Sequence, residues 1–276
     1  MNPPSTPWRL PLMVSLLIGL GDAVISPAHG FEWPGMGKIL STLDGKERVE
    51  RIIDGDTFTL PQGKKVRVLG IDCPEVAKSG KPAEPLGNDA KKRAMGLLKG
   101  RSVTLSSDQD KIDDFKRSLA YVATEDGKDL GEILLSEGLA MVYVRPPNLS
   151  RAQRYLEIED QARNNQLGIW STKGGRRVAA DRAVDHMDGY RVIHGQVTEV
   201  ERIGHSYRIH FGHDHKSDFS ISITERNWKK YFPAHEMPNS YFLKKTMEAR
   251  GRISYEDGPS IHVSHPLQLK FLPVSR

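Results

Sequence analysis

The sequence predicts a mainly β fold with some α-helix: a first β-barrel decorated by three helices, followed by a second, smaller β-barrel. Three observations predict this class. Short runs of β-type residues alternate with Asp-Gly and Gln-Gly turn signals along the chain. Stretches with helical apolar periodicity interrupt these runs. A Gly-rich basic segment, Ser171–Arg177, separates two regions of different charge and is typical of a linker.

Composition and charge indicate where the domains begin and end. The 276 residues are 38% hydrophobic and 27% charged, which is typical of a globular protein and excludes a disordered chain. Residues 46–171 hold 21 Lys and Arg against 20 Asp and Glu, whereas residues 172–276 hold 17 against 12. The second region also holds nine of the ten histidines. We therefore predict a first domain at 46–171, a linker at 172–189 and a second domain at 190–276.

The N-terminus has the pattern of a secretory signal. Arg9 is the only charge among the first nine residues, residues 10–21 are apolar apart from Ser15, and small residues follow. The apolar run is shorter than the roughly 20 residues that span a bilayer. We predict a signal peptide at 1–30, an N-terminal extension at 31–45 and a secreted or periplasmic protein with no stable membrane span after cleavage. An uncleaved anchor is the alternative.

Each predicted element of the first domain has a local reason. Asp129 is expected to cap a helix that reaches Glu137, with Gly138 as its end, and Ser150 is expected to cap the last helix. An earlier helix is expected at Asn88–Leu98, where alanines and leucines share one stripe and Gly100 follows. The β-type runs are Arg48–Ile53, Thr57–Leu60, Lys65–Leu69, Arg101–Ser106 and Leu119–Thr124.

The second domain shows three strands, one capped helix and further strands. The helix is expected at Thr224–Phe232, where Thr224 caps it and Pro233 ends it. This order, strand-strand-strand-helix-strand-strand, is that of the OB barrel. The β-type runs are Tyr190–Glu201, Tyr207–Gly212, Phe219–Ile223, Thr246–Tyr255, Ser260–Val263 and Leu267–Phe271.

A cluster of acids and one arginine lies on the early strands. Asp56, Asp72 and Glu75 supply three carboxylates, and Arg67 lies between them in sequence. Convergent carboxylates bind a hard divalent cation, and an arginine beside them recognises phosphate. These residue types together predict phosphodiester chemistry. Arg117, directly before a predicted strand, is the candidate for a second arginine at the same site.

Four motifs in this order resemble the staphylococcal-nuclease (thermonuclease) family across roughly residues 46–171. They are an Asp-Gly-Asp-Thr turn, an Arg-x4-Asp-x-Pro-Glu run, an Arg-x-Leu-Ala-Tyr run and a terminal Leu-Gly-Ile-Trp-Ser. In this sequence they begin at Asp54, Arg67, Arg117 and Leu167. The resemblance implies an SNase-like OB-fold barrel and a calcium-dependent nuclease that hydrolyses DNA, with RNA as a further candidate substrate.

The resemblance also implies a role for each site residue. Arg67, Glu75 and Arg117 would be the catalytic trio, with Glu75 as general base and the two arginines as clamps on the phosphate. Calcium would be bound by Asp56, Asp72 and the backbone carbonyl of Cys73. Candidate substrate-binding residues are Lys116, Tyr143 and Arg145.

Several positions depart from the family pattern. Cys73 stands where threonine is usual, and as the chain's only cysteine it can form no intramolecular disulfide. We interpret it as a small residue packed in a turn, and a catalytic nucleophile is the alternative. Lys116-Arg117-Ser118 replaces Gly-Arg-Gly, which predicts a different loop shape. Phe115 replaces a tyrosine, and Tyr143 is what remains of a later tyrosine cluster.

Residues 190–272 resemble the OB-like nuclease-associated domain that follows some exported members of the family. The positive charge and the aromatic residues of this region suit single-stranded nucleic acid, and a purely structural appendage is the alternative. For the histidines at 205–215 we favour a solvated loop over a metal site. The alternative function for the whole chain is a catalytically inactive nucleic-acid-binding protein with two OB barrels. The complete trio argues against it.

Overall fold

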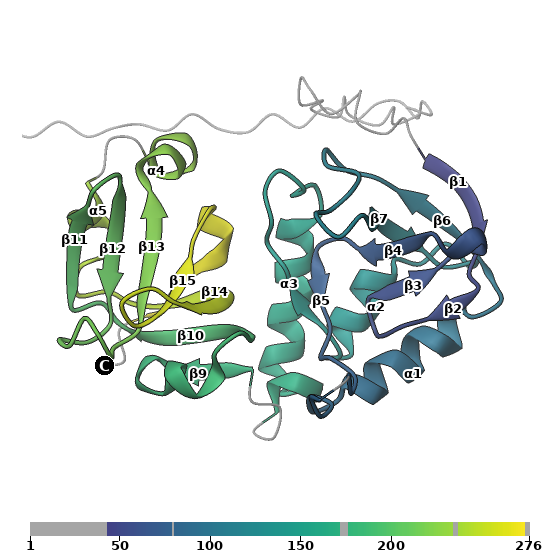
Figure 1. Cartoon of the computed structure of the whole chain (residues 1–276), viewed down its shortest axis with the longest axis horizontal. Helices are drawn as coiled ribbons and strands as arrows, with labels where there is room; N and C mark the ends of the chain where they lie inside the picture. The colour runs from purple at the N-terminus through teal and green to yellow at the C-terminus, as the bar shows by residue number, and fades with distance from the viewer. Residues whose placement is uncertain (1–42, 79, 172–175, 234–236, 274–276) are drawn as a thin grey trace, which may run out of the picture. The chain divides into compact units, whose positions relative to one another are not determined.

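A computed structural model describes residues 43–78, 80–171, 176–233 and 237–273 of the chain. The predicted signal peptide and most of the predicted N-terminal extension lie outside these residues. Within the described residues, no helix is both long enough and apolar enough to cross a membrane. Thr42–Arg276 forms one compact unit, which contains two large β-sheets (Figure 1).

The first sheet has the strand order β1-β6-β7-β4-β3-β2. Its two edge strands follow each other directly in the chain, separated only by Val49 and Glu50. Val49 donates to the Arg101 carbonyl on one side, and Glu50 donates to the Thr59 carbonyl on the other. One bent segment therefore lies at both edges, although no ladder joins β1 to β2 within the described part. The strands are β1 (Leu43–Arg48), β2 (Arg51–Ile52), β3 (Thr57–Thr59), β4 (Lys65–Val68), β6 (Ser102–Ser106) and β7 (Ser118–Ala123).

Three helices accompany this sheet, as the sequence predicts: α1 (Gly87–Leu98), α2 (Leu130–Ser136) and α3 (Ala152–Asn164). The Asp129 cap is confirmed, since its side chain accepts from the Glu132 amide at 3.0 Å. The prediction that Ser150 caps α3 is wrong. Arg151 occupies the N-cap position and its side chain forms no capping hydrogen bond, while the Ser150 amide donates to Asp108. A short pair, β5 (Ile71–Asp72) and β8 (Met141–Val142), lies beside the main sheet.

The core of the first half lies between the curled sheet and the helices, and Tyr155 of α3 is one of its largest buried side chains. Its hydroxyl donates to Asp129 at 2.9 Å, which ties α3 to the start of α2. Gly131 and Gly70 approach its ring so closely that a Cβ would lie 2.5 Å and 2.9 Å from ring or hydroxyl atoms. Glycine at these two positions therefore allows α3 to pack close to the turn that carries the acidic cluster.

The second sheet repeats the order of the first, β11-β12-β13-β15-β14-β10, with β9 outside β10 and β16 on β14. We count β1 with β2 as one strand of the first sheet and β10 with β11 as one strand of the second. The third and fifth strands of each sheet then pair in parallel, β4 with β7 and β13 with β15. The predicted OB order is therefore present twice. The strands are β9 (Arg177–Ala179), β10 (Tyr190–Gln196), β11 (Glu199–Ile203), β12 (Ser206–His210), β13 (Ser220–Thr224), β14 (Thr246–Tyr255), β15 (Pro259–His262) and β16 (Leu269–Phe271).

Two helices belong to the second half, α4 (Glu225–Tyr231) and α5 (Pro238–Phe242). Thr224 caps α4 as predicted, accepting from the Asn227 amide at 3.2 Å, whereas α5 was not predicted. The single strand expected at 190–201 is divided at Val197 and Thr198 into β10 and β11. The short 3₁₀ helices are η2 (Pro61–Gly63), η3 (Gly168–Trp170), η4 (Ala180–His186) and η5 (Pro266–Gln268).

Charged side chains join the two halves across α3 and β14. Arg250 binds Glu159 with two hydrogen bonds of 2.7 and 3.0 Å, and both side chains are buried. Glu248, also buried, accepts from Arg163 at 2.7 Å and from Arg177 at 2.6 Å. A small apolar cluster completes the contact, made of Met141, Ile169, Tyr190 and Val192.

Candidate active site

The acidic cluster comes from two neighbouring turns that the strand pairing brings together. β3 and β4 pair antiparallel with Thr57 opposite Arg67, so Asp56 lies directly before the residue that faces Arg67. The Val68 amide donates to the Asp56 carbonyl at 2.8 Å and fixes this register. The chain then turns back at Gly70, whose φ of +76° favours glycine, and β5 carries Asp72 to the same place.

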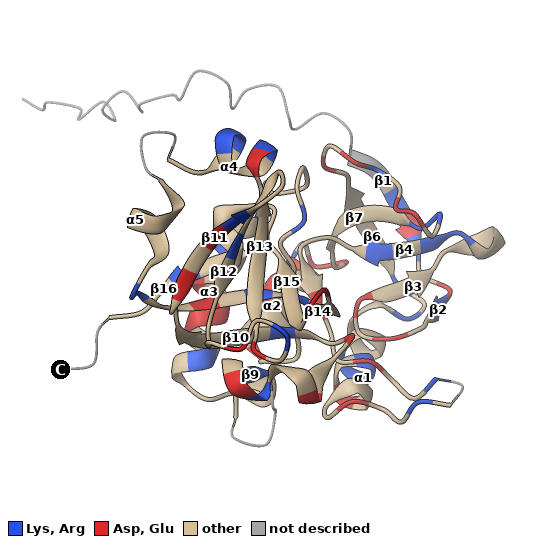
Figure 2. Cartoon of the chain, turned by 60° about the vertical axis from the view of Figure 1, so that its left-hand side comes forward, with Lys and Arg blue, Asp and Glu red and all other residues tan. Residues whose placement is uncertain are grey.

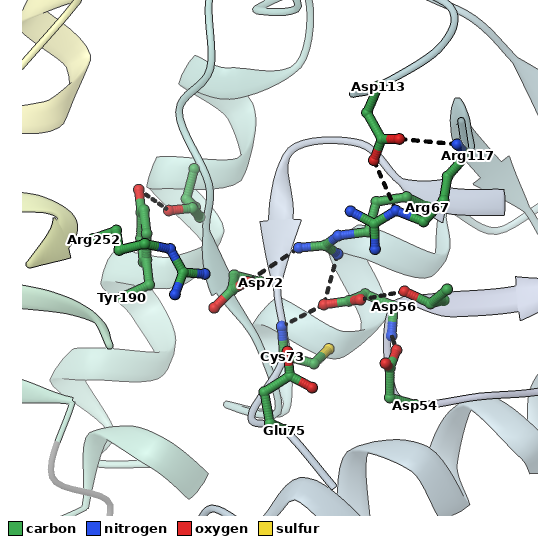
Figure 3. Close-up of polar contacts among 12 residues, drawn as sticks. Asp54, Asp56, Arg67, Asp72, Cys73, Glu75, Asp113, Arg117, Tyr190 and Arg252 are labelled. Atoms are coloured by element: carbon green, nitrogen blue, oxygen red, sulfur yellow. Dashed lines mark hydrogen bonds and ion pairs between the residues drawn. The ribbon is translucent and has the colours of Figure 1, made fainter. Parts of the chain in front are cut away.

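Arg67 binds both aspartates (Figure 3). Its Nη1 lies 2.6 Å from Asp56 Oδ2, and its Nη2 donates to Asp72 Oδ1 at 3.0 Å. The first contact is an ion pair whose angles do not meet those of a hydrogen bond, since Nη1 has no hydrogen-bond partner. Burial opposes the charge of Arg67, but Asp56 and Asp72 together raise its pKa above the ordinary value.

Asp56 is the most constrained of the carboxylates. Its Oδ2 accepts from the Cys73 amide at 2.7 Å, and its Oδ1 accepts from the Thr57 hydroxyl at 3.0 Å. Its own amide donates to Asp54 at 3.2 Å, which brings a further acid into the cluster. The Asp-Gly-Asp-Thr turn thus fixes the orientation of Asp56 through its neighbours in sequence.

Three aspartates, Asp54, Asp56 and Asp72, gather around one arginine, Arg67, which pairs directly with two of them. Burial and the neighbouring Asp56 raise the pKa of Asp54 to about 7. Burial also raises the pKa of Asp72 to about 6, although Arg67 opposes the shift. Carboxylates that are this crowded and buried favour a bound cation. Because all the donors are oxygens, the residues present fit a hard divalent ion such as calcium or magnesium better than a thiolate-seeking metal.

The Cys73 side chain is buried and does not line the cleft that holds Arg67 and the carboxylates. Its sulfur packs against the Asp54-Gly55-Asp56 turn, where a Cβ on Gly55 would lie 2.7 Å from it. Burial raises the pKa of the thiol well above its ordinary value, so the sulfur stays protonated. These facts agree with a small packed residue and not with a nucleophile.

Glu75 lies at the exposed side of the cluster. Lys78 donates to its Oε2 at 2.5 Å and also lies 3.9 Å from Asp54. The Glu75 backbone amide donates to Glu84, which in turn binds Arg176 and Arg191 of the second half. The backbone of Glu75 is therefore fixed while its carboxylate is open to solvent.

Arg117 is held by Asp113, which sequence reasoning did not single out. Asp113 accepts from the Arg117 backbone amide at 2.9 Å and from its Nε at 2.7 Å (Figure 3). Neither Nη group of Arg117 forms a hydrogen bond with a residue that the structure describes. Lys116, where the family pattern has glycine, adopts a φ of +60°. This is the left-handed region that glycine favours, so the lysine is strained there, and the predicted change of loop shape stays a prediction.

The predicted residues meet in one cleft of about 390 Å³. Its lining includes both arginines, both calcium candidates, the candidate base and two of the candidate substrate-binding residues: Asp56, Arg67, Asp72, Glu75, Arg117, Tyr143 and Arg145. Lys116 and Cys73 are not part of the lining. Lys116 is exposed outside it, and Cys73 contributes its amide to Asp56.

Arg252 of β14 also lines this cleft and was missed by sequence reasoning. Its guanidinium points toward Asp72 (Figure 3), and its charge lowers the pKa of Asp72 against the effect of burial. One signal was present in the sequence. Glu248, Arg250 and Arg252 alternate along one predicted strand, and three charges on one strand face indicate a contact surface rather than a core.

The histidine cluster of the second half forms a different group from the one considered in sequence. β12 ends at His210, and His213 is exposed. His210, His215 and Glu201 place possible metal-binding atoms within 4.8 Å of one another. However, the two imidazole rings stack at 3.9 Å with 16° between their planes. Their lone pairs are then nearly parallel and do not converge on one ion, so the contacts are explained by the hydrogen bond from His210 to Glu201 at 2.7 Å.

Comparison with known proteins agrees with this geometry. Residues 65–172 match the family described as "Staphylococcal nuclease homologue". The chain is 41% identical over 131 residues to endonuclease YncB of Bacillus subtilis, covering 46% of this chain and 62% of that protein. It is 39% identical over 131 residues to SPbeta prophage-derived endonuclease YokF of the same organism, covering 46% of this chain and 44% of the relative. The chain thus spans less than two thirds of these two curated relatives.

A third relative is covered almost completely. Thermonuclease of Staphylococcus hyicus is 34% identical over 164 residues, which cover 58% of this chain and 94% of that protein. Because the relative is matched over nearly its whole length, and residues 65–172 match the family model, the chain belongs to the staphylococcal nuclease family.

Proposed function

We propose that the protein is a calcium-dependent nuclease that hydrolyses phosphodiester bonds of DNA, with RNA as a further substrate. The observation that carries the proposal is the cleft in which Asp56 and Asp72 lie beside Arg67, with Glu75 and Arg117 in the same lining. The names of the relatives, endonuclease and thermonuclease, add support. The proposed calcium ligands are Asp56, Asp72 and the Cys73 carbonyl.

The two arginines are proposed to bind the reacting phosphate. Arg117 has its Nε on Asp113, which leaves both Nη groups available for a bidentate contact with phosphate oxygens. Arg67 forms ion pairs with two carboxylates in the structure, so it gives up at least one of them to reach a phosphate. Both positive charges then stabilise the additional negative charge of the five-coordinate transition state.

Glu75 is proposed as the general base that takes a proton from the attacking water. Its carboxylate is exposed on the cleft, and its backbone is fixed by Glu84, which suits a group that must meet solvent water in a defined position. Lys78 binds one of its oxygens, Oε2, and the other oxygen has no hydrogen-bond partner among the described residues, so it is free to accept the proton. Bound calcium supplies positive charge beside the phosphate and lowers the pKa of nearby water.

Export is part of the same proposal. It rests on the signal-like residues 1–30 alone, which lie outside the described part of the structure. Sequencing the N-terminus of protein recovered from the periplasm or medium tests it. A mature chain that begins near residue 31 is expected, and an intact Met1 would contradict cleavage.

The test of the nuclease proposal is cleavage of labelled single-stranded DNA, duplex DNA and RNA, with calcium and then with chelator. We expect cleavage with calcium and none with chelator. Undiminished cleavage in chelator would refute the calcium requirement. Retained DNA binding without cleavage under either condition would favour the alternative, an inactive nucleic-acid-binding protein.

Variants assign the roles. Glu75→Gln keeps the shape of the side chain but removes the base, so we expect a loss of about 10²–10⁴ in kcat. Arg117→Ala is expected to lose about 10²–10³. The matched control is Glu125→Gln, an exposed carboxylate in a distant turn, which should leave the rate unchanged. A fully active Glu75→Gln variant would remove Glu75 from the role of base.

A further inference from the structure

An open groove of about 810 Å³ lies between the two halves of the compact unit. It adjoins the candidate active site, because Tyr143, Arg145 and Arg252 line both spaces. One wall comes from the segment that follows β8 in the first half. The other wall comes from α4, β14 and β15 of the second half.

The described lining of this groove carries positive charge. Arg145, Arg226, Lys230 and Arg252 line it, and none of the described lining residues is an aspartate or glutamate. Arg226 and Lys230 form no ion pair with any residue that the structure describes. Figure 2 shows the basic residues on α4. Cations that have no ionic partner among the described residues, beside a cleft proposed to hold a phosphate, favour a polyanion.

The local structure of α4 explains why these cations face the groove. Trp228 is buried in the second core and fixes the inner face of the helix. Arg226 and Lys230 are four residues apart, so they lie on one face, and both line the groove. Lys229, equally exposed, is not part of the lining. The same helix therefore offers a matched control.

Aromatic rings accompany the charges along the groove. Tyr143 lies half-buried at the boundary with the active site, 5.0 Å from the ring of Tyr190. Tyr231 is half-buried on the α4 wall, with Lys230 4.7 Å from its ring centre. Rings between cations are the usual means of binding single strands, because bases stack on the rings while phosphates contact the charges. Two further aromatic residues of the second half, Phe219 and Trp228, are core residues.

We propose that this groove binds single-stranded nucleic acid, as the continuation of the strand whose phosphate lies in the active-site cleft. The second half would thereby extend the substrate site past Arg252 to Arg226 and Lys230 on α4. This inference rests on the proposed nuclease function for the position of the reacting phosphate. The groove itself is a binding site that can be measured without cleavage.

The experiment compares short and long strands in the presence of chelator, so that nothing is cut. Binding of labelled dT4 and dT16 to the full chain is followed by fluorescence anisotropy at several salt concentrations. The test variant is Arg226→Ala/Lys230→Ala. The control is Lys229→Ala/Lys216→Ala, which removes the same charge from exposed positions outside the groove lining. Thermal unfolding confirms that both variants are folded.

For the wild-type chain we expect tighter binding of dT16 than of dT4. In the test variant, the dT16 affinity relative to dT4 should fall roughly tenfold, equivalent to about 1.4 kcal/mol. Loss of two phosphate contacts should also reduce the slope of log K against log salt by about 1.4 for dT16. The control variant should bind both strands like the wild type.

An unchanged dT16-to-dT4 ratio in the test variant would overturn the inference, and so would an equal loss in the control variant. An equal loss for a blunt 16-base-pair duplex would overturn the assignment to single strands. Failure of the nuclease proposal is a different result. In that case no substrate is cut with calcium, while the length dependence of binding still reports on the groove.

Discussion

Replacing Arg250 by methionine is expected to destabilise the protein strongly, because it removes the partner of a buried carboxylate. Glu159 is fully buried on α3, and Arg250 on β14 is almost so. The guanidinium supplies Glu159 with two hydrogen bonds of 2.7 and 3.0 Å. In the variant the carboxylate keeps only the Val142 amide at 2.6 Å as a donor in the described structure. Breaking such a pair from one side costs about 3–5 kcal/mol.

A second variant separates the value of the pair from the cost of breaking it. Glu159→Met/Arg250→Met removes both charges, and the apolar side chains fill the space between α3 and β14. Replacing a whole buried pair by apolar residues is often neutral or stabilising. The Val142 amide loses its acceptor in this variant, at a cost of about 1–3 kcal/mol. We therefore expect the double variant to be more stable than Arg250→Met.

Equilibrium unfolding in urea measures these differences, with tryptophan fluorescence and circular dichroism as two probes. Lys270→Met is the control, since Lys270 binds Asp160 of α3 at 2.7 Å in the same contact but both side chains are over 40% exposed. An exposed pair contributes about 0–1 kcal/mol. A loss below about 1 kcal/mol for Arg250→Met, or a loss equal to that of the control, would refute the reasoning.

Three further predictions concern single side chains. Lys116→Gly should raise stability by up to about 1 kcal/mol, because the left-handed conformation costs lysine about 1–2 kcal/mol and glycine's extra chain entropy offsets about 0.5–1; a lower thermal midpoint would contradict this. Asp113→Ala releases the Arg117 side chain, so kcat should fall at least tenfold with little change in the circular dichroism spectrum, and full activity would contradict the positioning role. Burial alone would raise the pKa of Glu248, but Arg163 and Arg177 hold that pKa below its ordinary value of 4.5. The contribution of the ionised Glu248 to the free energy of unfolding is therefore present above pH 4.5 and is lost as the pH falls below that value. The unfolding free energies of the wild type and Glu248→Gln should therefore converge toward pH 3, and a constant gap from pH 7 to pH 3 would refute the assignment.

Local sequence rules predicted most of the elements because each depends on residues within a few positions. The helix at Gly87–Leu98 and the Asp129 and Thr224 caps follow from side chains three or four residues away. The strand order of both sheets follows from the sequence of strand and helix types together with the OB topology. Ser150 has the residue type of a cap, but Asp108 takes its amide into another hydrogen bond.

The site was predictable as far as its residues are close in sequence or fixed by family motifs. Asp56, Arg67 and Asp72 are joined by one hairpin and the turn after it, so their meeting depends on local register. The position of Arg252 in the site depends on a contact between segments that are more than 170 residues apart in sequence. No local sequence rule predicts such a contact. Lys116 shows another limit, since lysine rarely adopts the left-handed conformation that it has here and its residue type alone did not predict it.

The charged contact between α3 and β14 has a consequence for the order in which the protein assembles. Glu159, Asp160 and Arg163 lie on one stripe of α3, and their partners on β14 and β16 follow 85 to 110 residues later in the chain. Until these partners are synthesised, this face of the helix is hydrated and charged, so the nascent chain exposes little apolar surface there. An apolar face in the same place would invite aggregation at that stage. The ion pairs therefore stabilise the contact less than apolar packing would, but they keep the unpaired face of α3 hydrated until β14 has been synthesised.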